Sequence, residues 1–457
     1  MFEHRGSDMD KFAGIILAAG EGLRMKSRIP KVLHRLCGKE LIRYPIELLT
    51  KLGVDRTVVV VSPSNQDAVK QLLGDSVEYA IQASKTGTAG ATESAMNILQ
   101  GTVEHVLVMG SDSPLVAAES IQHLIEQHVL ENRYISILSG VVEDGSGLGR
   151  IVREVGSQRN VIGIVESVDD PVRSTDPIEV NSGVYCFQAH WLSENLEKVN
   201  TGFSSERYLP DLAAIAVGQG KPISAFPSKD PVEVLGINNR VELAYLEDIQ
   251  RRRIRERLML DGVTISDPES VTIDEDVIIG QDTIILPNTL IFGKTVIGSG
   301  CEIGPGSMVK GAVIGDDCKI TLSVVEDAVM EMRVDIGPFS RLRPGAYLEA
   351  DVHIGNYVEI KESRFGNGAV MGHFGYVGDA SIGANVNVGA GTVTCNYDGK
   401  DKHRTVVENE AFVGCDTMLV APVTVGAGAM TGAGAVVTKD VPPAGRVVGV
   451  PAKLIGR

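Results

Sequence analysis

Residues 273–309 read IDEDVIIGQDTIILPNTLIFGKTVIGSGCEIGPGSMV, and this stretch decides the fold of the C-terminal half of the chain. An aliphatic residue recurs in it at every sixth position, at Ile273, Ile279, Ile285, Ile291, Ile297, Ile303 and Val309. A period of six matches neither the 3.6-residue repeat of an α-helix nor the two-residue alternation of a strand. It predicts a hexapeptide β-solenoid, in which three short strands make one turn of a prism and the aliphatic side chain points inward.

The same spacing continues towards the C-terminus. After a slip of one residue it resumes at Ile314 and Ile320, then at Ile336, Leu342, Leu348, Ile354 and Ile360, and again at Val413, Leu419 and Val425. Glycine follows the aliphatic residue repeatedly, and we expect it to mark corners that need tight or left-handed backbone. Residues 395–404, CNYDGKDKHR, interrupt the repeat and should project as a loop, while Val441–Pro451 should form a capping tail.

The composition limits the classes of protein that fit the chain. A length of 457 residues predicts two to three domains. Lys and Arg number 43 and Asp and Glu number 59, and the resulting charge of −16 disfavours a general nucleic-acid or anionic-membrane binder. The six cysteines form no CxxC pair, and no segment reaches the ~18 apolar residues of a membrane span. We therefore expect a cytoplasmic protein with reduced thiols and without membrane insertion.

Residues 1–238 alternate short apolar runs with helical patterns. The expected strands are Ala13–Ala19, Thr57–Val61, Val77–Ile81, His105–Met109, Ile135–Val142, Val161–Glu166 and Val180–Phe187, and the expected helices include Glu40–Leu52, Thr88–Leu99 and Ala118–Leu130. This alternation predicts a mostly parallel sheet covered on both faces, with ligands at the carboxyl ends of its strands. Residues 239–261 form one long helical pattern that stops at Gly262. We therefore predict a domain over 1–238, a helical linker over 239–262 and a solenoid domain over 263–457.

The segment after the first expected strand has the character of a phosphate site. Residues 20–26 read GEGLRMK, and two glycines at this place let backbone N–H groups approach an anion closely. Five Lys or Arg residues and no acid lie between Arg24 and Arg35, which gives the local positive charge that a polyphosphate requires. The segment is neither GxGxxG nor a Walker P-loop, so a nicotinamide enzyme or a P-loop ATPase is disfavoured. The alternative is a glycine turn followed by a basic surface helix.

Polar residues after two other strands complete this candidate site. Asp112 follows the strand His105–Met109, where a carboxylate suits a hard divalent cation shared with substrate phosphates. A turn or helix-capping role is the alternative for Asp112. Gly87 and Thr88, just past Gln82, lie where a helix N-terminus would hold a base or a sugar.

A second constellation lies in the solenoid. Arg343 and Lys361 are 18 residues apart, one turn of the prism, so both should project from the same side and clamp a sugar phosphate. His373 falls near both by register, and an imidazole that titrates near neutrality can take a proton from an attacking amine. A structural histidine is the alternative for His373.

Several motifs resemble those of known enzymes. LAAGEGLRM, PKVLH, GTAGA, GIVES, EVNSGV and GINNR resemble the sugar-phosphate nucleotidyltransferases, and the solenoid adds RLRPGA, VEIK, GHFGYVGDA, NVGAGTVTCNYDG and VGCDT. Over essentially the whole chain they resemble the bacterial family of bifunctional N-acetylglucosamine-1-phosphate uridyltransferases and glucosamine-1-phosphate acetyltransferases. The resemblance implies an α/β Rossmann-like nucleotidyltransferase domain followed by a left-handed parallel β-helix of hexapeptide repeats.

The resemblance also implies an activity and an assembly. The family makes UDP-N-acetylglucosamine for peptidoglycan and lipopolysaccharide synthesis. Glucosamine-1-phosphate is acetylated by acetyl-CoA, and UMP is then transferred from UTP to N-acetylglucosamine-1-phosphate with release of pyrophosphate. The implied cofactor is Mg²⁺, with Mn²⁺ as the alternative ion. A homotrimer is implied, with an acetyltransferase site built from more than one subunit, and the flat sides of a prism fit packing around a threefold axis.

The resemblance assigns roles to residues of the first domain. Those expected to contact the uridine and the uracil are Leu17, Ala18, Ala19, Gly20, Gln82, Gly87 and Thr88. Those expected to bind the N-acetylglucosamine portion are Gly149, Glu166 and Asn181. Lys31 would sit at the phosphates with Arg24 as a further charge clamp, and Asp112 and Asn238 would ligate the metal ion while Asn238 also contacts the nucleotide. Ser111 stands where the family usually has Gly.

The resemblance likewise assigns roles in the solenoid. His373 would deprotonate the amino group of glucosamine-1-phosphate, which attacks acetyl-CoA. The residues expected to hold the sugar phosphate are Arg343, Lys361, Tyr376 and Asn387. The acetyl-CoA site would include Ala390, Asn396, Tyr397, Cys415 and Ala433, with a backbone N–H near Ala390 facing the tetrahedral oxyanion. Cys415 stands where Ser is common and Gly449 where the family has Arg, so the CoA phosphates would meet Lys402, Arg404 or Arg446.

Two other classes of function stay open. One is a single-activity sugar-1-phosphate nucleotidyltransferase with a structural or regulatory solenoid, although a purely structural prism has no need for His373. The other is a non-catalytic assembly subunit of similar build, although such a subunit has no need for Lys31, Asp112 and Asn238.

Overall fold

The structure is a computed structural model that describes residues 11–99, 101–143, 145, 147–157, 160–166, 177–200 and 206–456. The chain divides into two compact units, Met1–Asp248 and Ile249–Arg457. The division falls inside α8 (Arg240–Leu260), within the segment that the sequence predicts to be a helical linker. Among the described residues, every helix is too short or too polar to cross a membrane.

A mixed sheet forms the centre of the N-terminal unit, with the strand order β11-β7-β10-β6-β1-β4-β5. Its strands are β1 (Phe12–Leu17), β4 (Thr57–Val61), β5 (Glu78–Ile81), β6 (His105–Gly110), β7 (Ile135–Val142), β10 (Ile178–Gln188) and β11 (Ile223–Pro227). Strands β6, β1, β4 and β5 are parallel, as are β7 and β11, and their near-continuous runs of Val, Ile and Leu fit burial on both faces. The predicted α/β, Rossmann-like nucleotidyltransferase fold is confirmed.

Strand β10 is the exception, because it runs antiparallel to both of its neighbours, β6 and β7. It also carries the antiparallel pair β8 (Arg150–Arg153) and β9 (Val161–Val165). Antiparallel pairing needs no crossover helix, so β8 and β9 extend the sheet from β10 without an intervening helix. Two of the expected sugar-binding residues, Asn181 on β10 and Glu166 just after β9, belong to this extension.

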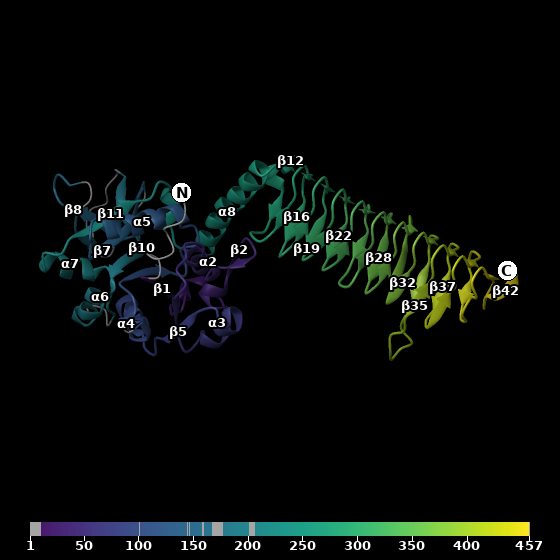
Figure 1. Cartoon of the computed structure of the whole chain (residues 1–457), viewed down its shortest axis with the longest axis horizontal. Helices are drawn as coiled ribbons and strands as arrows, with labels where there is room; N and C mark the ends of the chain where they lie inside the picture. Colours follow the sequence, from purple (N-terminus) through teal and green to yellow (C-terminus); the bar gives the residue numbers. More distant parts are fainter. Residues whose placement is uncertain are drawn as a thin grey trace. The chain divides into compact units, whose positions relative to one another are not determined.

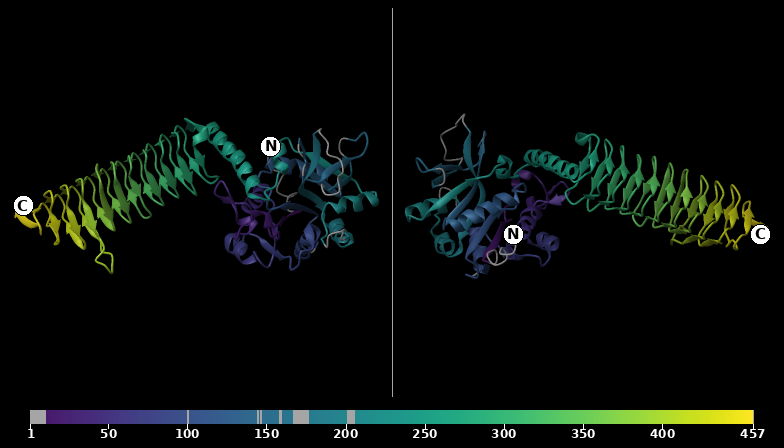
Figure 2. Two further views of the ribbon diagram at one scale, coloured as in Figure 1. Left: turned by 180° about the vertical axis from the view of Figure 1, so that it is seen from behind. Right: turned by 45° about the horizontal axis from the view of Figure 1, so that its top comes forward.

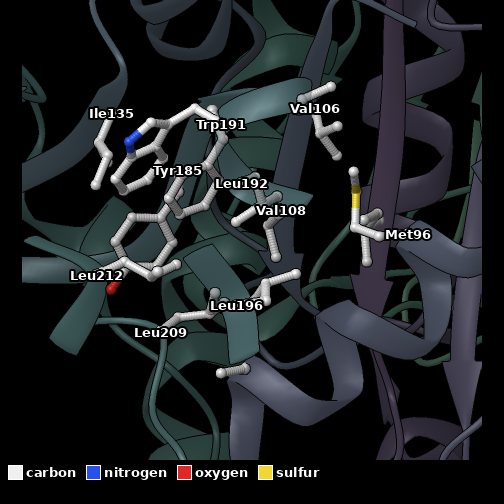
Figure 3. Packing of buried hydrophobic residues seen from close by; sticks show 14 of the residues in the cluster. Met96, Val106, Val108, Ile135, Tyr185, Trp191, Leu192, Leu196, Leu209 and Leu212 are labelled. Carbon is white, nitrogen blue, oxygen red and sulfur yellow. The ribbon is translucent and has the colours of Figure 1, made fainter. Parts of the chain in front are cut away.

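Helices cover both faces of the sheet. They are α2 (Arg43–Lys51), α3 (Gln66–Leu73), α4 (Gly87–Leu99), α5 (Ala118–Leu130), α6 (Ala189–Asn195) and α7 (Asp211–Gly218). Alternate strand residues such as Ile15 and Val108 pack against α4, α6 and α7, and Figure 3 shows Trp191 within this core. The residues between them, such as Ile16 and Leu107, pack against α2, α3 and α5.

Short elements complete the N-terminal unit. They are η1 (Leu23–Met25), η2 (Lys31–Leu33), β2 (Arg35–Leu36), β3 (Lys39–Glu40), η3 (Leu196–Lys198) and η4 (Pro231–Val234).

The C-terminal unit is a solenoid whose short strands stack into three sheets over the described residues (Figures 1 and 2). The first sheet contains β12 (Thr264–Ile265), β15 (Ile284–Ile285), β18 (Glu302–Ile303), β21 (Lys319–Ile320), β24 (Asp335–Ile336), β27 (His353–Ile354), β30 (Val370–Met371), β33 (Asn387–Val388), β36 (Phe412–Val413), β39 (Met430–Thr431), β41 (Arg446–Val448) and β42 (Lys453–Gly456). The second contains β13 (Thr272–Ile273), β16 (Leu290–Phe292), β19 (Met308–Lys310), β22 (Val324–Glu326), β25 (Arg341–Leu342), β28 (Val358–Lys361), β31 (Gly375–Gly378), β34 (Val393–Cys395), β37 (Met418–Val420) and β40 (Val436–Val437). The third contains β14 (Ile278–Ile279), β17 (Val296–Ile297), β20 (Val313–Ile314), β23 (Val329–Met330), β26 (Tyr347–Leu348), β29 (Arg364–Phe365), β32 (Ala380–Ile382), β35 (Thr405–Val407) and β38 (Val423–Val425), and η5 (Pro268–Ser270) lies near the start of the solenoid.

The six-residue spacing arises because each aliphatic residue belongs to a column inside the prism. Ile285 pairs in register with Ile303, and the same column continues through Ile320, Ile336 and Ile354 on successive coils. All five side chains are buried. The predicted left-handed parallel β-helix of hexapeptide repeats is therefore confirmed.

Most of the glycines that follow the aliphatic residues lack the left-handed backbone that the sequence led us to expect, although Gly304 (φ 107°) and Gly337 (φ 116°) have positive φ. Gly355 and Gly389 are not among the residues with positive φ, whereas Asp351 (φ 62°) and Asn385 (φ 55°) in the turns are. A Cβ atom on Gly389 would lie 2.5 Å from the backbone nitrogen of Cys415 on the next coil. Glycines such as Gly389 are needed for the close approach of neighbouring coils, so the tight-backbone part of the expectation holds for them, while the left-handed part holds at Gly304 and Gly337.

The expected loop is present, but the end of the solenoid differs from the expected capping tail. Residues 396–404 leave the solenoid between β34 and β35 as a projecting loop closed by a bridge between Tyr397 and Lys402 (Figure 1). The tail expected over 441–451 still contributes to the prism, because Val441 pairs with Val425 and β41 pairs with β39. The closure comes later, where β42 pairs antiparallel with β41.

Candidate functional site

A cavity of about 900 Å³ opens at the carboxyl ends of β1, β5 and β6. Most of the nucleotide-site residues expected from the sequence line it: Leu17, Ala19, Gly20, Arg24, Lys31, Gln82, Gly87, Thr88, Asp112, Glu166, Asn181 and Asn238. Ala18 is buried and is not among the described lining residues; its carbonyl accepts a hydrogen bond from Asn65 Nδ2 (2.8 Å). Gly149 is also buried and is not among the described lining residues; its carbonyl accepts a hydrogen bond from Asn181 N (2.8 Å).

The glycine-rich loop brings a lysine up against the end of β1. Gly22 has left-handed backbone (φ 61°), and a Cβ atom there would lie 2.5 Å from the Cβ of Lys31. The Lys31 side chain can therefore pack this close to the loop only because residue 22 is glycine.

Four side chains meet at one point of the cavity. Lys31 Nζ forms an ion pair with Asp112 Oδ2 (2.5 Å) and donates a hydrogen bond to Asn238 Oδ1 (3.0 Å). Arg24 Nη2 donates to the same Asn238 oxygen (2.9 Å). A carboxylate oxygen and an amide oxygen thus converge on a single cationic group, with a second cation beside them.

This donor set fits a magnesium-type ion. The carboxylate of Asp112 and the amide oxygen of Asn238 are hard oxygen ligands. Among the described residues there is no cluster of three or more His, Cys, Asp or Glu side chains. A site with two protein oxygens leaves the remaining ligand positions to substrate phosphates and water, which is how Mg²⁺ is commonly held in nucleotide enzymes.

Asn238 is placed by the start of α8. Its backbone N–H donates to Glu242 Oε2 (2.6 Å), while Asn239 Oδ1 accepts from the N–H groups of Val241 (2.9 Å) and Glu242 (3.0 Å). The Asn239 side chain thus caps the first backbone N–H groups of α8, and the Glu242 side chain accepts from the backbone just before the helix, as in a capping box. The motif GINNR therefore combines Asn238, an expected metal ligand, with the start of the helix that fixes its backbone.

The loop after β5 forms the side of the cavity that contains the residues expected to bind the base. Gln82 Nε2 donates to Thr86 Oγ1 (3.0 Å) and to the carbonyl of Gly87 (2.9 Å). Residues 206–210 pack along this loop, since Arg207 N donates to Thr86 O (3.0 Å) and Leu209 N donates to Thr88 Oγ1 (2.9 Å). The sequence analysis missed this second segment, because nothing local to residues 206–210 predicts their pairing with residues 86–88.

Strand β10 carries Asn181, one of the residues expected to bind the sugar. Asn181 Nδ2 donates to the hydroxyl of Tyr185 (2.6 Å), and burial raises the pKa of Tyr185 well above its usual range. Tyr185 therefore stays neutral and fixes the Asn181 amide. Ser111, which stands where the resembling family has glycine, is buried and donates its N–H to Leu17 O (3.1 Å). Gly110, Asp112 and Ser113 line the cavity, but Ser111 is not among the described lining residues.

In the solenoid, the expected sugar-phosphate residues lie on neighbouring coils. Arg343 N donates to Ile360 O (2.9 Å), so Arg343 and Lys361 project from adjacent rungs of the second sheet. Arg343 pairs with Glu359 (2.7 Å), and the Lys361 ammonium lies 3.9 Å from a carboxylate oxygen of Asp379.

His373 lies at the corner where two sheets meet. It is exposed in the turn between β30 of the first sheet and β31 of the second. Tyr376 follows on β31, in register with Glu359 of the previous coil. Asn387 lies on β33 of the first sheet, in register with Val370. The four expected sugar-phosphate residues therefore come from two sheets whose common corner carries the imidazole.

The expected acetyl-CoA residues Ala390, Cys415 and Ala433 form a column along the same edge of the prism. Ala390 O accepts from Asp416 N (2.7 Å), and Cys415 O accepts from Gly434 N (2.8 Å), which stacks the three corners on consecutive coils. Above them, Phe374 O accepts from Gly391 N (2.7 Å), which connects the column to the turn of His373.

The projecting loop also reaches this site. Asn396 Nδ2 donates to Asp379 Oδ2, the same carboxylate oxygen that faces Lys361. The Lys361 side chain lowers the pKa of Lys402, so the two amines are neighbours. Lys402, which the sequence offered as a CoA-phosphate contact, thus lies beside Lys361 and the expected sugar-phosphate residues. Tyr397 is exposed on the loop, and its hydroxyl donates to Gly399 O (2.7 Å).

The fold and the cavity define the N-terminal unit as a nucleotidyltransferase. Residues 13–234 match the family model described as nucleotidyl transferase. Over nearly its whole length the chain is also similar to curated proteins named bifunctional protein GlmU. The relative from Exiguobacterium sp. strain ATCC BAA-1283 / AT1b is 44% identical over 435 residues, covering 95% of this chain and 96% of its own.

Two further relatives carry the same name. The one from Geobacillus sp. strain WCH70 is 44% identical over 435 residues, covering 95% of this chain and 94% of its own. The one from Syntrophomonas wolfei is 41% identical over 434 residues, covering 95% and 96% respectively. The chain belongs to the GlmU family of bifunctional proteins, and it is a transferase. The family membership predicted from the sequence is confirmed.

Proposed function

We propose that the chain makes UDP-N-acetylglucosamine by two reactions, acetyl transfer in the solenoid and uridyl transfer in the N-terminal unit. The observation that carries the proposal is the coexistence of two separate sets of groups in one chain. One is the convergence of Lys31, Arg24, Asp112 and Asn238 on one point of a nucleotide-sized cavity. The other is an exposed His373 at a corner of the prism, between residues suited to a sugar phosphate.

For uridyl transfer, the chain's contribution is positioning and charge. Gln82, Gly87 and Thr88 orient the base, and Glu166 and Asn181 orient the sugar, so that a phosphate oxygen of N-acetylglucosamine-1-phosphate faces the α-phosphorus of UTP. A new P–O bond forms as the bond to pyrophosphate breaks. Lys31 and Arg24 stabilise the charge on the phosphate oxygens. A Mg²⁺ ion, held by Asp112 and Asn238, would add further neutralisation of phosphate charge when bound.

For acetyl transfer, the chain supplies a base and an anchor. His373 accepts a proton from the amino group of glucosamine-1-phosphate, and the nitrogen attacks the thioester carbonyl of acetyl-CoA. The C–S bond breaks and CoA leaves as the thiol. Arg343, Lys361, Tyr376 and Asn387 hold the sugar phosphate.

The oxyanion that forms during acetyl transfer needs a hydrogen-bond donor. The N–H groups of Gly389, Gly391 and Thr392 donate within the solenoid, to Val413 O, Phe374 O and Gly389 O. These contacts leave the N–H of Ala390 as the donor of this segment that we assign to the oxyanion.

The assembly and location follow from the same proposal. The column Ala390, Cys415 and Ala433, with the projecting loop, offers one side of an acetyl-CoA site, and a homotrimer would supply the rest from a neighbouring subunit. Light scattering should give a mass near three times 48.7 kDa. A stable monomer with full acetyltransferase activity would contradict the trimer. All six cysteines are free thiols, which supports the expected cytoplasmic location.

Two assays of the full-length protein test the proposal. UTP with N-acetylglucosamine-1-phosphate should release pyrophosphate, and acetyl-CoA with glucosamine-1-phosphate should release free CoA thiol. Excess EDTA should abolish only the first reaction, because only the nucleotide site uses hard oxygen ligands. Pyrophosphate release without any CoA release would favour a single-activity nucleotidyltransferase, and neither release would favour a non-catalytic assembly subunit.

A further inference from the structure

Helix α5 begins with an unusual cap. The residue at its N-cap is Ala117, which has no side-chain acceptor and is a poor residue for this position. The acceptor comes instead from Glu233, 116 residues further along the chain. Glu233 Oε2 accepts from Ala117 N (3.0 Å), and Glu233 Oε1 accepts from the hydroxyl of Ser120 in the first turn (3.0 Å).

The carboxylate of Glu233 is well suited to this place. The residue is 3% exposed, so its charge is almost entirely removed from solvent. Both oxygens are hydrogen-bonded, and the positive end of the α5 dipole faces them, so burial of the charge is compensated. The short helix η4, which carries Glu233, is capped by a side chain of its own, because Asp230 Oδ1 accepts from Val232 N (3.0 Å).

The same two segments are joined a second time at the nucleotide site. Ile237 N donates to the carbonyl oxygen of Asp112 (2.9 Å). Residues 112–117 and 233–237 are therefore tied at both ends, at Asp112 by Ile237 and at Ala117 by Glu233. Asn238 follows Ile237 directly, so the two oxygen ligands that converge on Lys31 lie at one end of this double tie.

We propose that Glu233 is a positioning residue for the uridyltransferase site, holding Asp112 and Asn238 at the separation that a divalent cation with a nucleotide requires. Glu233 is not among the described residues that line the cavity, so it acts through the tie and not by touching substrate. This inference rests on the proposed uridyl transfer.

The test measures Mn²⁺ binding by electron paramagnetic resonance in the presence of UTP, using the full-length protein. Glu233→Ala should raise the dissociation constant of Mn²⁺ about tenfold, in the range seen when groups behind metal ligands are removed. Glu233→Gln should stay close to wild type, because its amide oxygen can accept from Ala117 N and its NH₂ group can donate to the Ser120 hydroxyl. Ser120→Ala, which removes one of the two bonds, should weaken Mn²⁺ binding roughly fivefold, corresponding to about 1 kcal/mol.

A matched control separates positioning from general destabilisation. Val69→Ala removes buried volume from α3 in the core on the same face of the sheet as α5, away from the cavity. Its loss of stability can be compared with that of Glu233→Ala through the fluorescence of Trp191, and its Mn²⁺ affinity should be unchanged. Acetyl transfer should be unchanged in every variant.

The outcomes separate the inference from the function on which it rests. Wild-type affinity for Mn²⁺ in a folded Glu233→Ala protein would overturn the inference, as would a Glu233→Gln protein as weak as Glu233→Ala. If Glu233→Ala does not fold, Ser120→Ala decides the question, and wild-type affinity in that variant would overturn the inference. A wild-type protein that neither binds Mn²⁺ with UTP nor releases pyrophosphate would overturn the proposed function, and the inference with it.

Discussion

Acidification from pH 7 to pH 5 should destabilise the N-terminal unit through His128. This residue is fully buried on α5, where its Nδ1 lies 2.9 Å from Ser136 Oγ on β7 and its Nε2 lies 3.2 Å from His105 Nδ1 on β6. Burial, and next the nearby His105, lower the pKa of His128 from 6.5 to about 3. Burial likewise lowers the pKa of His105, on which Glu104 and Lys11 act with opposite signs.

The sign and size of the effect follow from the two states. Between pH 6.5 and pH 3 the unfolded chain binds a proton at this position and the folded chain does not, so stability is lost as the pH falls through that window. With those two pKa values, His128 alone lowers the free energy of unfolding by about 2 kcal/mol between pH 7 and pH 5, approaching the limit of about 1.4 kcal/mol per pH unit. Because His128 and Asp112 belong to the same compact unit and His373 belongs to the other, uridyl transfer should be lost on unfolding at low pH before acetyl transfer.

The assay uses the only tryptophan of the chain. Trp191 is buried in the core of the N-terminal unit, so its fluorescence reports the unfolding of that unit in denaturant (Figure 3). His128→Asn keeps an acceptor near Ser136 and removes the titrating ring, and it should lose much of the difference in stability between pH 7 and pH 5. His190→Asn, on the exposed end of α6, is the control and should keep that difference. An unchanged difference in His128→Asn would refute the reasoning.

Two other predictions concern the solenoid. Gly389→Ala should destabilise the solenoid by about 1–3 kcal/mol, because the new Cβ would meet the backbone nitrogen of Cys415. Gly456→Ala is the control and should have no such effect, because its Cβ would meet nothing within 4 Å. Denaturant unfolding followed by circular dichroism measures the stability of both variants. Lys361→Met should raise the pKa of Lys402, because it removes the neighbouring ammonium that lowers this pKa, and the pH dependence of amine labelling at Lys402 relative to Lys400 measures the change. Identical labelling profiles in wild type and Lys361→Met would contradict the second prediction.

The features that the sequence predicted well are those with a local signal. The solenoid follows from the six-residue spacing because one aliphatic side chain per rung must fill one column, as Ile303 and Ile320 do. The parallel strands follow from uninterrupted apolar runs such as Thr57–Val61, because both faces of that strand are covered. The glycine-rich loop and Asp112 were found at the cavity because both follow strands of the same sheet, whereas Leu17, Glu166, Asn181 and Asn238 came from the family resemblance alone.

The features that the sequence missed depend on contacts between distant segments. Helix α3 (Gln66–Leu73) is short, and strand β11 (Ile223–Pro227) ends in a proline, so neither gives a strong pattern. The pairing of Arg207 with Thr86 and the capping of α5 by Glu233 join segments more than 100 residues apart. The only local trace of the second contact is Ala117, an N-cap that cannot cap its own helix.

The central claim is that one chain carries two separate transferase sites. The most direct test measures both activities in full-length Asp112→Ala and His373→Ala proteins. Asp112→Ala should lose uridyl transfer, and His373→Ala should lose acetyl transfer by roughly 10²–10⁴-fold, the usual contribution of a general base. Because the two residues belong to different compact units, each variant should keep the other activity within about twofold. A folded His373→Ala protein that has lost uridyl transfer, or that keeps full acetyl transfer, would contradict the claim.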